Sequence, residues 1–121
     1  SCKNIAIDFL QQVAMGGIRA AYQNYVADNF RHHNPYFRGD AESLMAGMLE
    51  NAAANPQKLL EVRLALQEDD LVTVFSRVRL QPGGSDFALV HIFRFEDQRI
   101  AELWDIGQMV PADAVNQFGM F

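Results

Sequence analysis

Apolar residues in the first half of the chain recur with the period of an α-helix. Residues 5–14 place apolar side chains three or four positions apart, and Gly16-Gly17 interrupts the pattern. A second helical run covers residues 18–26. A third covers residues 40–54, where Asp40 can cap the first turn. The sequence therefore predicts three helices, followed by a stop at Asn55-Pro56.

The second half alternates apolar and polar positions with a period of two, which is typical of strands. Four runs have this pattern: residues 58–68, 71–80, 86–96 and 99–109. The connections between them are too short for crossover helices, so we expect antiparallel pairing. Helices followed by such a meander predict an α+β fold, a curved antiparallel sheet with helices on one face. A sheet of this kind forms a cone whose open end can hold a ligand.

Composition limits the class of protein. The chain has 121 residues, of which 50% are hydrophobic, so we expect a single domain, residues 1–121, with its own core. The net charge is −5 and the basic residues are scattered, which argues against nucleic acid or an acidic membrane as partner. The chain has no run of about 18 apolar residues, so we expect no membrane span. Cys2 is the only cysteine, which excludes an internal disulfide and favours a cytoplasmic location.

The last predicted hairpin decides whether His91 and Asp105 can act together. Side chains alternate between the two faces of a sheet, so the loop length fixes which of them share a face. With a two-residue loop at Asp97-Gln98, the two side chains would point to opposite faces. A three-residue loop, with Gln98 in the left-handed conformation, puts them on one apolar face and diagonal to each other. We favour the three-residue loop, because it separates an apolar face from a mixed one.

Asp105 then lies on an otherwise apolar surface. An unpaired carboxylate there is costly, so it is paired, neutral or functional. Burial raises the pKa of a carboxyl group and a charged histidine lowers it, so Asp105 with His91 can form an acid-base pair poised near neutral pH. The alternative is that the two side chains only hydrogen-bond each other within the core.

Three stretches, "FRHHNP", "HIFRFEDQRIAELWDIGQMVP" and "NQFGMF", together resemble the SnoaL-like polyketide cyclases. More narrowly, they resemble the predicted SnoaL-like aldol-condensation-catalysing proteins. The resemblance spans almost the whole chain. It implies the nuclear-transport-factor-two-like fold, a cystatin-like α+β barrel shared with ketosteroid isomerase, scytalone dehydratase and limonene epoxide hydrolase.

The resemblance also implies a chemistry. Polyketide cyclases of this type use an aspartate on the last hairpin as general acid and base, near a histidine on the preceding strand. Asp105 matches the aspartate, and His91 falls at the position of the histidine. The narrower branch often has aspartate where His91 stands and glycine where Gln98 stands, so the chain departs from the pattern at both positions.

In "HHNP", His33 and Asn34 match the family's "QHNP", and His32 is the variant residue. The resemblance places this segment beside the pocket, where His33 or Asn34 would hydrogen-bond a substrate carbonyl and stabilise enolate charge. The alternative is that His33 only pins the loop through backbone carbonyls. Pro35 makes residues 30–37 extended, and neighbouring side chains of an extended chain point in opposite directions. We therefore expect His32 to face outward.

Two other groupings deserve a hypothesis. His33, His91 and Asp105 could form a two-histidine, one-carboxylate metal set, but no short-range ligand spacing supports it, and we expect no metal. Trp104 lies on the face opposite Asp105 and would form an apolar outer patch with Val90, Ile92 and Ile106. Such a patch predicts a homodimer through the sheet, unless the terminal segment, residues 110–121, covers it.

Two functions remain open on this fold. The first is a cofactor-free enzyme in which Asp105 moves a proton alpha to the carbonyl of a small apolar ligand, in an aldol cyclisation, isomerisation or dehydration. The second is a non-catalytic small-molecule binder or interaction module. The sequence has no phosphate-binding or dinucleotide-binding motif, so we expect no cofactor.

The size of the pocket depends on a set of apolar residues. We expect four of them to contact the ligand: Phe37, Met48, Phe75 and Phe93. Met45 and Leu64 complete the set. Alternation also places Leu60, Val62, Leu64 and Leu66 on one face of their strand.

Overall fold

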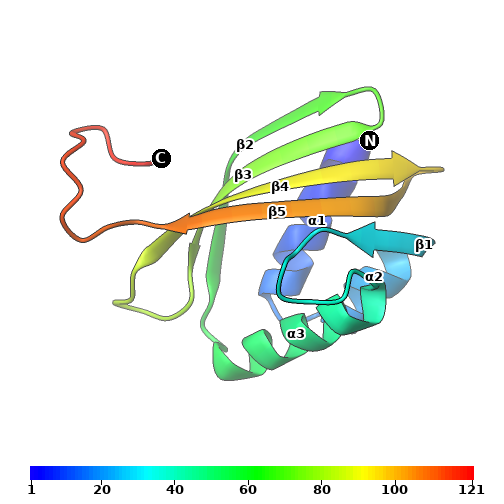
Figure 1. Cartoon of the computed structure of the whole chain (residues 1–121), viewed down its shortest axis with the longest axis horizontal. Helices are drawn as coiled ribbons and strands as arrows, with labels where there is room; N and C mark the ends of the chain where they lie inside the picture. Colours follow the sequence, from blue (N-terminus) through cyan, green and yellow to red (C-terminus); the bar gives the residue numbers. More distant parts are fainter.

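The computed structural model describes residues 1–121 and contains three helices and five strands (Figure 1). The elements in chain order are α1 (Cys2–Ala14), α2 (Ile18–Tyr25), β1 (Val26–His32), α3 (Ala41–Ala54), β2 (Leu59–Glu68), β3 (Leu71–Arg79), β4 (Asp86–Glu96) and β5 (Arg99–Met109). The predicted α+β class is confirmed. No helix is both long enough and apolar enough to cross a membrane.

The five strands form one open sheet in the order β1-β5-β4-β3-β2. Strands β2 to β5 pair antiparallel as predicted, whereas β1 pairs parallel to β5. The sheet curves but does not close, so the barrel expected from the resemblance is an open one. Helix α1 packs against β2 and β3, and α3 contacts β1, so the helices cover the inner face of the sheet (Figure 1).

The sequence analysis missed β1, which it divided between a helix and an extended segment. Helix α2 ends at Tyr25, and only three side chains of the following strand are buried: Val26, Phe30 and His32. The register with β5 shifts between Val26 and Arg31. The alternation is interrupted before Phe30, so the first part of the strand could not be separated from the end of the helix.

The core lies between α1, α2 and the inner face of the sheet. Its largest fully buried side chains include Phe9 and Ile18 from the helices and Phe93, Ile100 and Leu103 from the strands. Phe9 meets Phe93 edge to face, with 6.1 Å between ring centroids. Burial of these side chains supplies the main stabilisation of the fold. The packed core occupies one end of the inner face and leaves the other end free for a cavity.

Strand β2 contains a bulge that changes which of its residues face inward. Its register with β3 shifts between Val62 and Leu64. Beyond the shift Ala65 faces inward, while Leu64 and Leu66 are 62% and 69% exposed. The predicted single face from Leu60 to Leu66 is therefore wrong after Val62, because one extra residue reverses the alternation.

The predicted three-residue loop of the β4–β5 hairpin is wrong, although the shared face of His91 and Asp105 that it implied is confirmed. Its loop has two residues, Asp97 and Gln98, with φ of 50° and 62°, and Glu96 pairs with Arg99. A bulge follows: Phe95 pairs with Ile100, but Arg94 pairs with Glu102, which leaves Ala101 as the extra residue. This bulge reverses the alternation that the tight loop would impose. As a result, His91 lies directly opposite Asp105 on the inner face.

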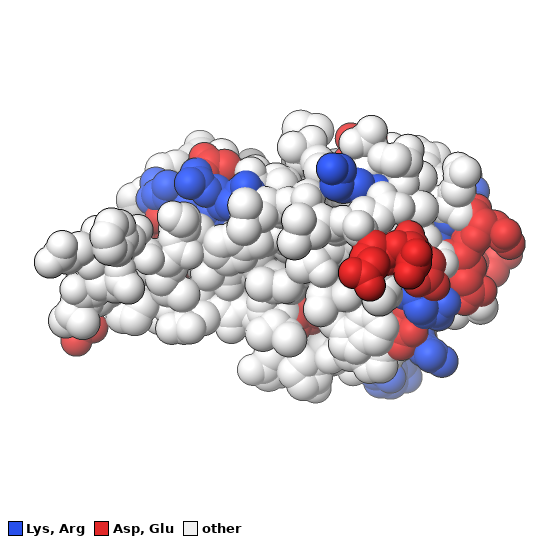
Figure 2. Space-filling view, turned by 90° about the horizontal axis from the view of Figure 1, so that it is seen from above, with Lys and Arg blue, Asp and Glu red and all other residues white.

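Charge is unevenly distributed over the surface. Seen from above, acidic side chains gather at one end of the molecule (Figure 2). The β2–β3 turn with Asp69-Asp70 and the β4–β5 turn with Asp97 both lie at one end of the sheet. Lys and Arg side chains on this face occur in small separate groups and form no continuous basic surface (Figure 2).

Candidate functional site

The segment between β1 and α3 is anchored to the sheet by its backbone. His33 N–H donates to the Leu103 carbonyl at 3.0 Å, which extends the pairing of β1 with β5. His32 N–H donates to the Gly39 carbonyl at 3.0 Å and closes the loop. Gly39 has a φ of 108°, which favours glycine. The loop therefore holds Asn34 beside the inner face of β5.

Asn34 is held in one orientation by three hydrogen bonds. Its Oδ1 accepts from Tyr36 N–H at 2.9 Å, an Asx turn that spans Pro35. Its backbone N–H donates to His32 Nδ1 at 3.1 Å. With Oδ1 occupied, Nδ2 is directed to Asp105 and donates to Oδ2 at 2.9 Å. The sequence therefore builds a fixed amide donor for one oxygen of the Asp105 carboxylate.

The second oxygen of Asp105 is free within the protein. Asp105 Oδ1 and His91 Nδ1 are both buried, and neither has a hydrogen-bond partner. Buried polar atoms are rarely left unpaired, so each one needs an explanation, and a catalytic role is one such explanation. The structure thus brings Asp105 and His91 together, but it contains no hydrogen bond between them. The alternative of a mutually bonded core pair does not apply.

His91 is electrically neutral at neutral pH. Burial lowers the pKa of His91 from 6.5 to about 4, and the charge of Asp105 only partly opposes this effect. A ring with such a pKa is a poor proton acceptor near pH 7, although it can still donate or accept a hydrogen bond. The hypothesis of an acid-base pair poised near neutrality is therefore replaced by a carboxylate beside a neutral imidazole.

The two adjacent histidines point in opposite directions, as predicted, but their assignment is reversed. His32 is buried, whereas His33 lies on the outer face. His32 Nδ1 accepts the Asn34 N–H, so the neutral ring carries its proton on Nε2, which has no partner. Burial lowers the pKa of His32, and the charge of Asp105 raises it to a smaller extent. His32 is not part of the cavity wall, and its link to the site is the hydrogen bond that it accepts from the Asn34 backbone.

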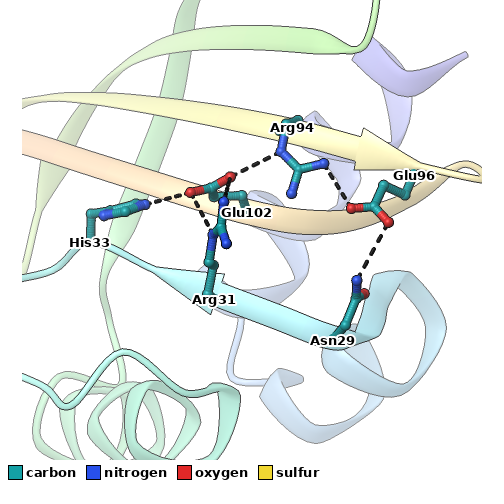
Figure 3. Close-up of polar contacts among 6 residues, drawn as sticks. All are labelled: Asn29, Arg31, His33, Arg94, Glu96 and Glu102. Atoms are coloured by element: carbon teal, nitrogen blue, oxygen red, sulfur yellow. Dashed lines mark hydrogen bonds and ion pairs between the residues drawn. The ribbon is translucent and has the colours of Figure 1, made fainter.

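His33 belongs to a polar cluster on the outer face (Figure 3). Its Nε2 lies 2.6 Å from Glu102 Oε2, and its ring stacks on Trp104 with 4.9 Å between centroids. Arg31 and Arg94 also bond Glu102, at 2.8 and 2.9 Å. These donors, Arg31 above all, lower the pKa of Glu102 to about 2. The three proposed metal ligands are not brought together, because His33 lies on the other side of the sheet from Asp105.

A cavity of about 330 Å³ opens beside Asp105. Eleven of its seventeen lining residues are hydrophobic, and the polar ones are Asn34, Asn51, Lys58, His91 and Asp105. The hydrophobic lining comes from α1, α3 and the inner face of β2 to β4, together with Phe37 and Leu80 in the connecting segments. Volumes of about 300–1,000 Å³ with few polar groups are usual for small-molecule sites.

Of the four apolar residues predicted to contact a ligand, two line the cavity. Phe37 and Met48 are part of its wall. Phe93 is fully buried in the core. Phe75 points to the outer face, where it stacks on Phe121 with 5.9 Å between centroids. Along β3 the inward positions are taken by Val74 and Ser76, on either side of Phe75.

The sequence analysis did not single out Tyr22 as part of the site. Its hydroxyl donates to Met48 Sδ at 3.2 Å, beside the cavity wall. Burial raises the pKa of Tyr22, and the Asp105 charge raises it further, so the phenol keeps its proton. Only the helical spacing of Tyr22 was visible in the sequence, and that spacing indicates burial without indicating a neighbour.

Fold and site together define a class of protein. The chain is a nuclear-transport-factor-two-like α+β protein, with three helices packed on a curved open sheet and an apolar cavity beside a carboxylate. The family model described as the SnoaL-like domain matches residues 8–103. The chain belongs to the SnoaL-like domain family, and the resemblance seen in the sequence is confirmed. No curated protein sequence matches the chain at a significant level.

Solved structures with the same fold are distant in sequence. IdmH from Streptomyces antibioticus, a proposed polyketide cyclase, is 17% identical with a TM-score of 0.75, over 89% of this chain and 92% of that one. AclR from Streptomyces galilaeus, a proposed hydroxylase, is 20% identical with a TM-score of 0.76, over 89% and 79%. An NTF2-like protein of unknown function from Cytophaga hutchinsonii is 16% identical with a TM-score of 0.72, over 89% and 90%. These likenesses concern the fold, which carries different activities.

Proposed function

We propose that the protein is a cofactor-independent acid/base enzyme that acts alpha to the carbonyl of a small, mostly apolar substrate. One observation carries the proposal. Asp105 lines an apolar cavity with Oδ2 held by Asn34 and Oδ1 left without a partner. A carboxylate oxygen that is fixed in place and free of protein donors is what a general base requires.

The reaction step follows from this geometry. Asp105 Oδ1 takes a proton from the carbon alpha to the carbonyl. The C–H electron pair forms the enolate double bond, and the carbonyl π electrons move to oxygen. The proton on Asp105 is then returned, either to carbon in an isomerisation or to a leaving hydroxyl in a dehydration. In an aldol cyclisation, the enolate carbon attacks a second carbonyl of the same molecule and the new alkoxide takes the proton.

His91 supports this step as a neutral group. Its low pKa keeps the ring uncharged, so it can donate a hydrogen bond to the developing enolate oxygen from the nitrogen that carries its proton. His33, for which the sequence suggested that role, lies on the outer face. Catalysis is therefore proposed for Asp105, with His91 at the oxygen and Asn34 as the residue that positions the carboxylate.

The second candidate is a non-catalytic small-molecule binder on the same fold. The two candidates differ in whether Asp105 can reach a ligand, and its place in the cavity wall favours the enzyme. The test is an Asp105→Asn variant, assayed for cyclised, isomerised or dehydrated products from a panel of ketones. We expect turnover to fall about 100-fold or more. Asp113→Asn, a change at an exposed aspartate, is the control. Equal turnover in the two variants would remove Asp105 from the mechanism, and no turnover by the wild type would leave only a binder.

We also propose that a second copy of the chain covers the outer face of the sheet. This face exposes Leu64, Leu66 and Ile106, each by more than 60%. The C-terminal segment covers only one part of it, where Phe121 lies between Phe75 and Arg77. Contiguous apolar surface of this kind marks an interface. Sedimentation equilibrium should give twice the mass of the chain, and a monomer at micromolar concentration would contradict this proposal.

A further inference from the structure

The cavity has polar groups in two separate places. Asn34, His91 and Asp105 form one group, and Asn51 with Lys58 forms the other. The remaining lining between them is apolar apart from glycine. The proposed chemistry uses only the first group, so the second needs its own explanation.

The sheet register separates the two groups along the cavity. On the inner face His91 lies opposite Val74, whereas Leu60 lies opposite Val78, two inward rows away. Lys58 precedes Leu60 by two residues, which adds one further row. Three rows correspond to about 20 Å along extended strands, and this is an upper limit for a curved sheet. The lining residues Leu60, Val78, Phe87 and Leu89 occupy the rows between, so Lys58 and Asp105 lie at opposite ends of the cavity along the strands.

Lys58 is a cation without a counterion. It is half-buried, and its side chain makes no ion pair or hydrogen bond. It is also the only lysine or arginine in the cavity wall. Burial lowers the pKa of the Lys58 ammonium group, as expected where no anion compensates for lost water. An anionic ligand group at this end would restore the missing interaction.

Asn51 provides a second observation at the same end. Its Oδ1 is buried without a hydrogen-bond partner, although the residue lines the cavity from α3. Rotation of the amide by half a turn exchanges Oδ1 and Nδ2, so Asn51 can also present a donor there. An ammonium and an amide together are a suitable pair for a carboxylate.

We propose that the cavity selects elongated, apolar keto acids, with the carboxylate bound at Lys58 and Asn51 and the ketone at Asp105. The proposal rests on the proposed function for the ketone end, while the carboxylate end stands on its own contacts. The charges at the two ends are opposite, so a ligand carboxylate is attracted to Lys58 and repelled by Asp105. This polarity would orient the substrate and place its alpha carbon next to Asp105.

The test compares matched ligands in a direct binding measurement. The probes are ω-oxo-ω-phenylalkanoates with chains of four to nine carbons, each paired with its neutral primary amide. Calorimetry should show that the best carboxylate binds about tenfold tighter than its amide. Lys58→Met should remove this preference, and Lys58→Arg should retain part of it. The chain has one other lysine, the exposed Lys3, so Lys3→Met is the matched control and should change nothing.

A second readout follows the ammonium group itself. With its lysines isotope-labelled by reductive methylation, the chain gives two lysine signals, and the Lys58 signal should titrate at a higher pH when the carboxylate is bound. Equal affinity for carboxylate and amide, no binding by any member of the series, or a preference that survives Lys58→Met would overturn the proposal. Asp105→Asn should keep the preference while losing turnover, so the two proposals can fail separately.

Discussion

At the scale of single residues, the site depends on neutral groups around one carboxylate. His91 and His32 are both buried beside Asp105, and burial lowers the pKa of each. Asn34 is fixed by its own turn and donates to Asp105. A carboxylate with uncharged neighbours can accept a proton, because no adjacent cation stabilises its ionised form.

The pKa of His91 leads to a prediction. Its value is about 4 in the folded protein and about 6.5 in the unfolded chain, so the unfolded state binds more protons between these values. Stability from this residue is complete above pH 6.5 and is lost as the pH falls toward 4. The His91 ring resonance should therefore titrate with a midpoint near pH 4 in an NMR experiment.

His91→Gln is the control for this prediction. It assigns the resonance by its disappearance, and it should flatten the decline of unfolding free energy between pH 6.5 and 4. His32 contributes in the same direction, so part of the slope should remain. A His91 midpoint at pH 6 or above would mean that the ring is not desolvated as the structure shows.

The sequence identified several site residues but assigned the two histidines to the wrong faces. Asn34, Phe37, Met48, His91 and Asp105 all lie at the cavity, as the sequence led us to expect. His32 and His33 were exchanged because the analysis followed the family pattern and not the local alternation. Phe30 faces the core, and a residue two positions later must share its face.

At the scale of elements, short irregularities decide which side chains reach the cavity. The bulge in β2 reverses the alternation predicted after Val62, whereas the bulge at Ala101 restores the shared face of His91 and Asp105 that a two-residue loop alone would prevent. Regular helices and antiparallel strands follow from periodicity, and these were predicted. Periodicity did not reveal the bulge in β2, because the leucines continue to alternate through Leu64 and Leu66 although the strand register changes after Val62.

The outer cluster that ties β1 to β4 and β5 gives a second prediction. Glu102 accepts hydrogen bonds from Arg31, His33 and Arg94 (Figure 3). These interactions lower the pKa of Glu102 from 4.5 to about 2. A carboxyl with a lowered pKa stabilises the fold above its unfolded pKa and loses that effect as the pH falls through the folded one. Glu102→Gln should lower the unfolding free energy at pH 7 by about 1–3 kcal/mol and flatten its decline from pH 4.5 to 2.

Denaturant titrations at several pH values would measure this effect. The matched control is Glu61→Gln, which breaks the exposed pair of Glu61 with Arg63. Exposed pairs contribute little, so this variant should differ from the wild type by less than about 0.5 kcal/mol. If both variants lose the same stability, the cluster around Glu102 has no special structural role.

At the scale of the whole molecule, the fold divides its inner face between a core and a cavity. Phe93 and its neighbours close one end, and the apolar wall beside Asp105 leaves the other end open. The fold class follows from the order of helices and strands, which the sequence states clearly. The shape of the cavity depends on which face of the sheet each side chain occupies and on how several elements pack together. Neither property can be predicted from a single stretch of the sequence.

The most direct measurement of the central claim is the exchange of alpha hydrogens for deuterium in small ketones, followed by proton NMR in heavy water. It needs no knowledge of the natural substrate, because removal of the alpha proton is itself observed. The account predicts that the wild type accelerates exchange in ketones that bind the cavity, and that Asp105→Asn reduces this rate by about 100-fold or more while binding persists. Exchange that is equally fast in the variant, or absent in ketones that bind the wild type, would contradict the assignment of Asp105 as the base.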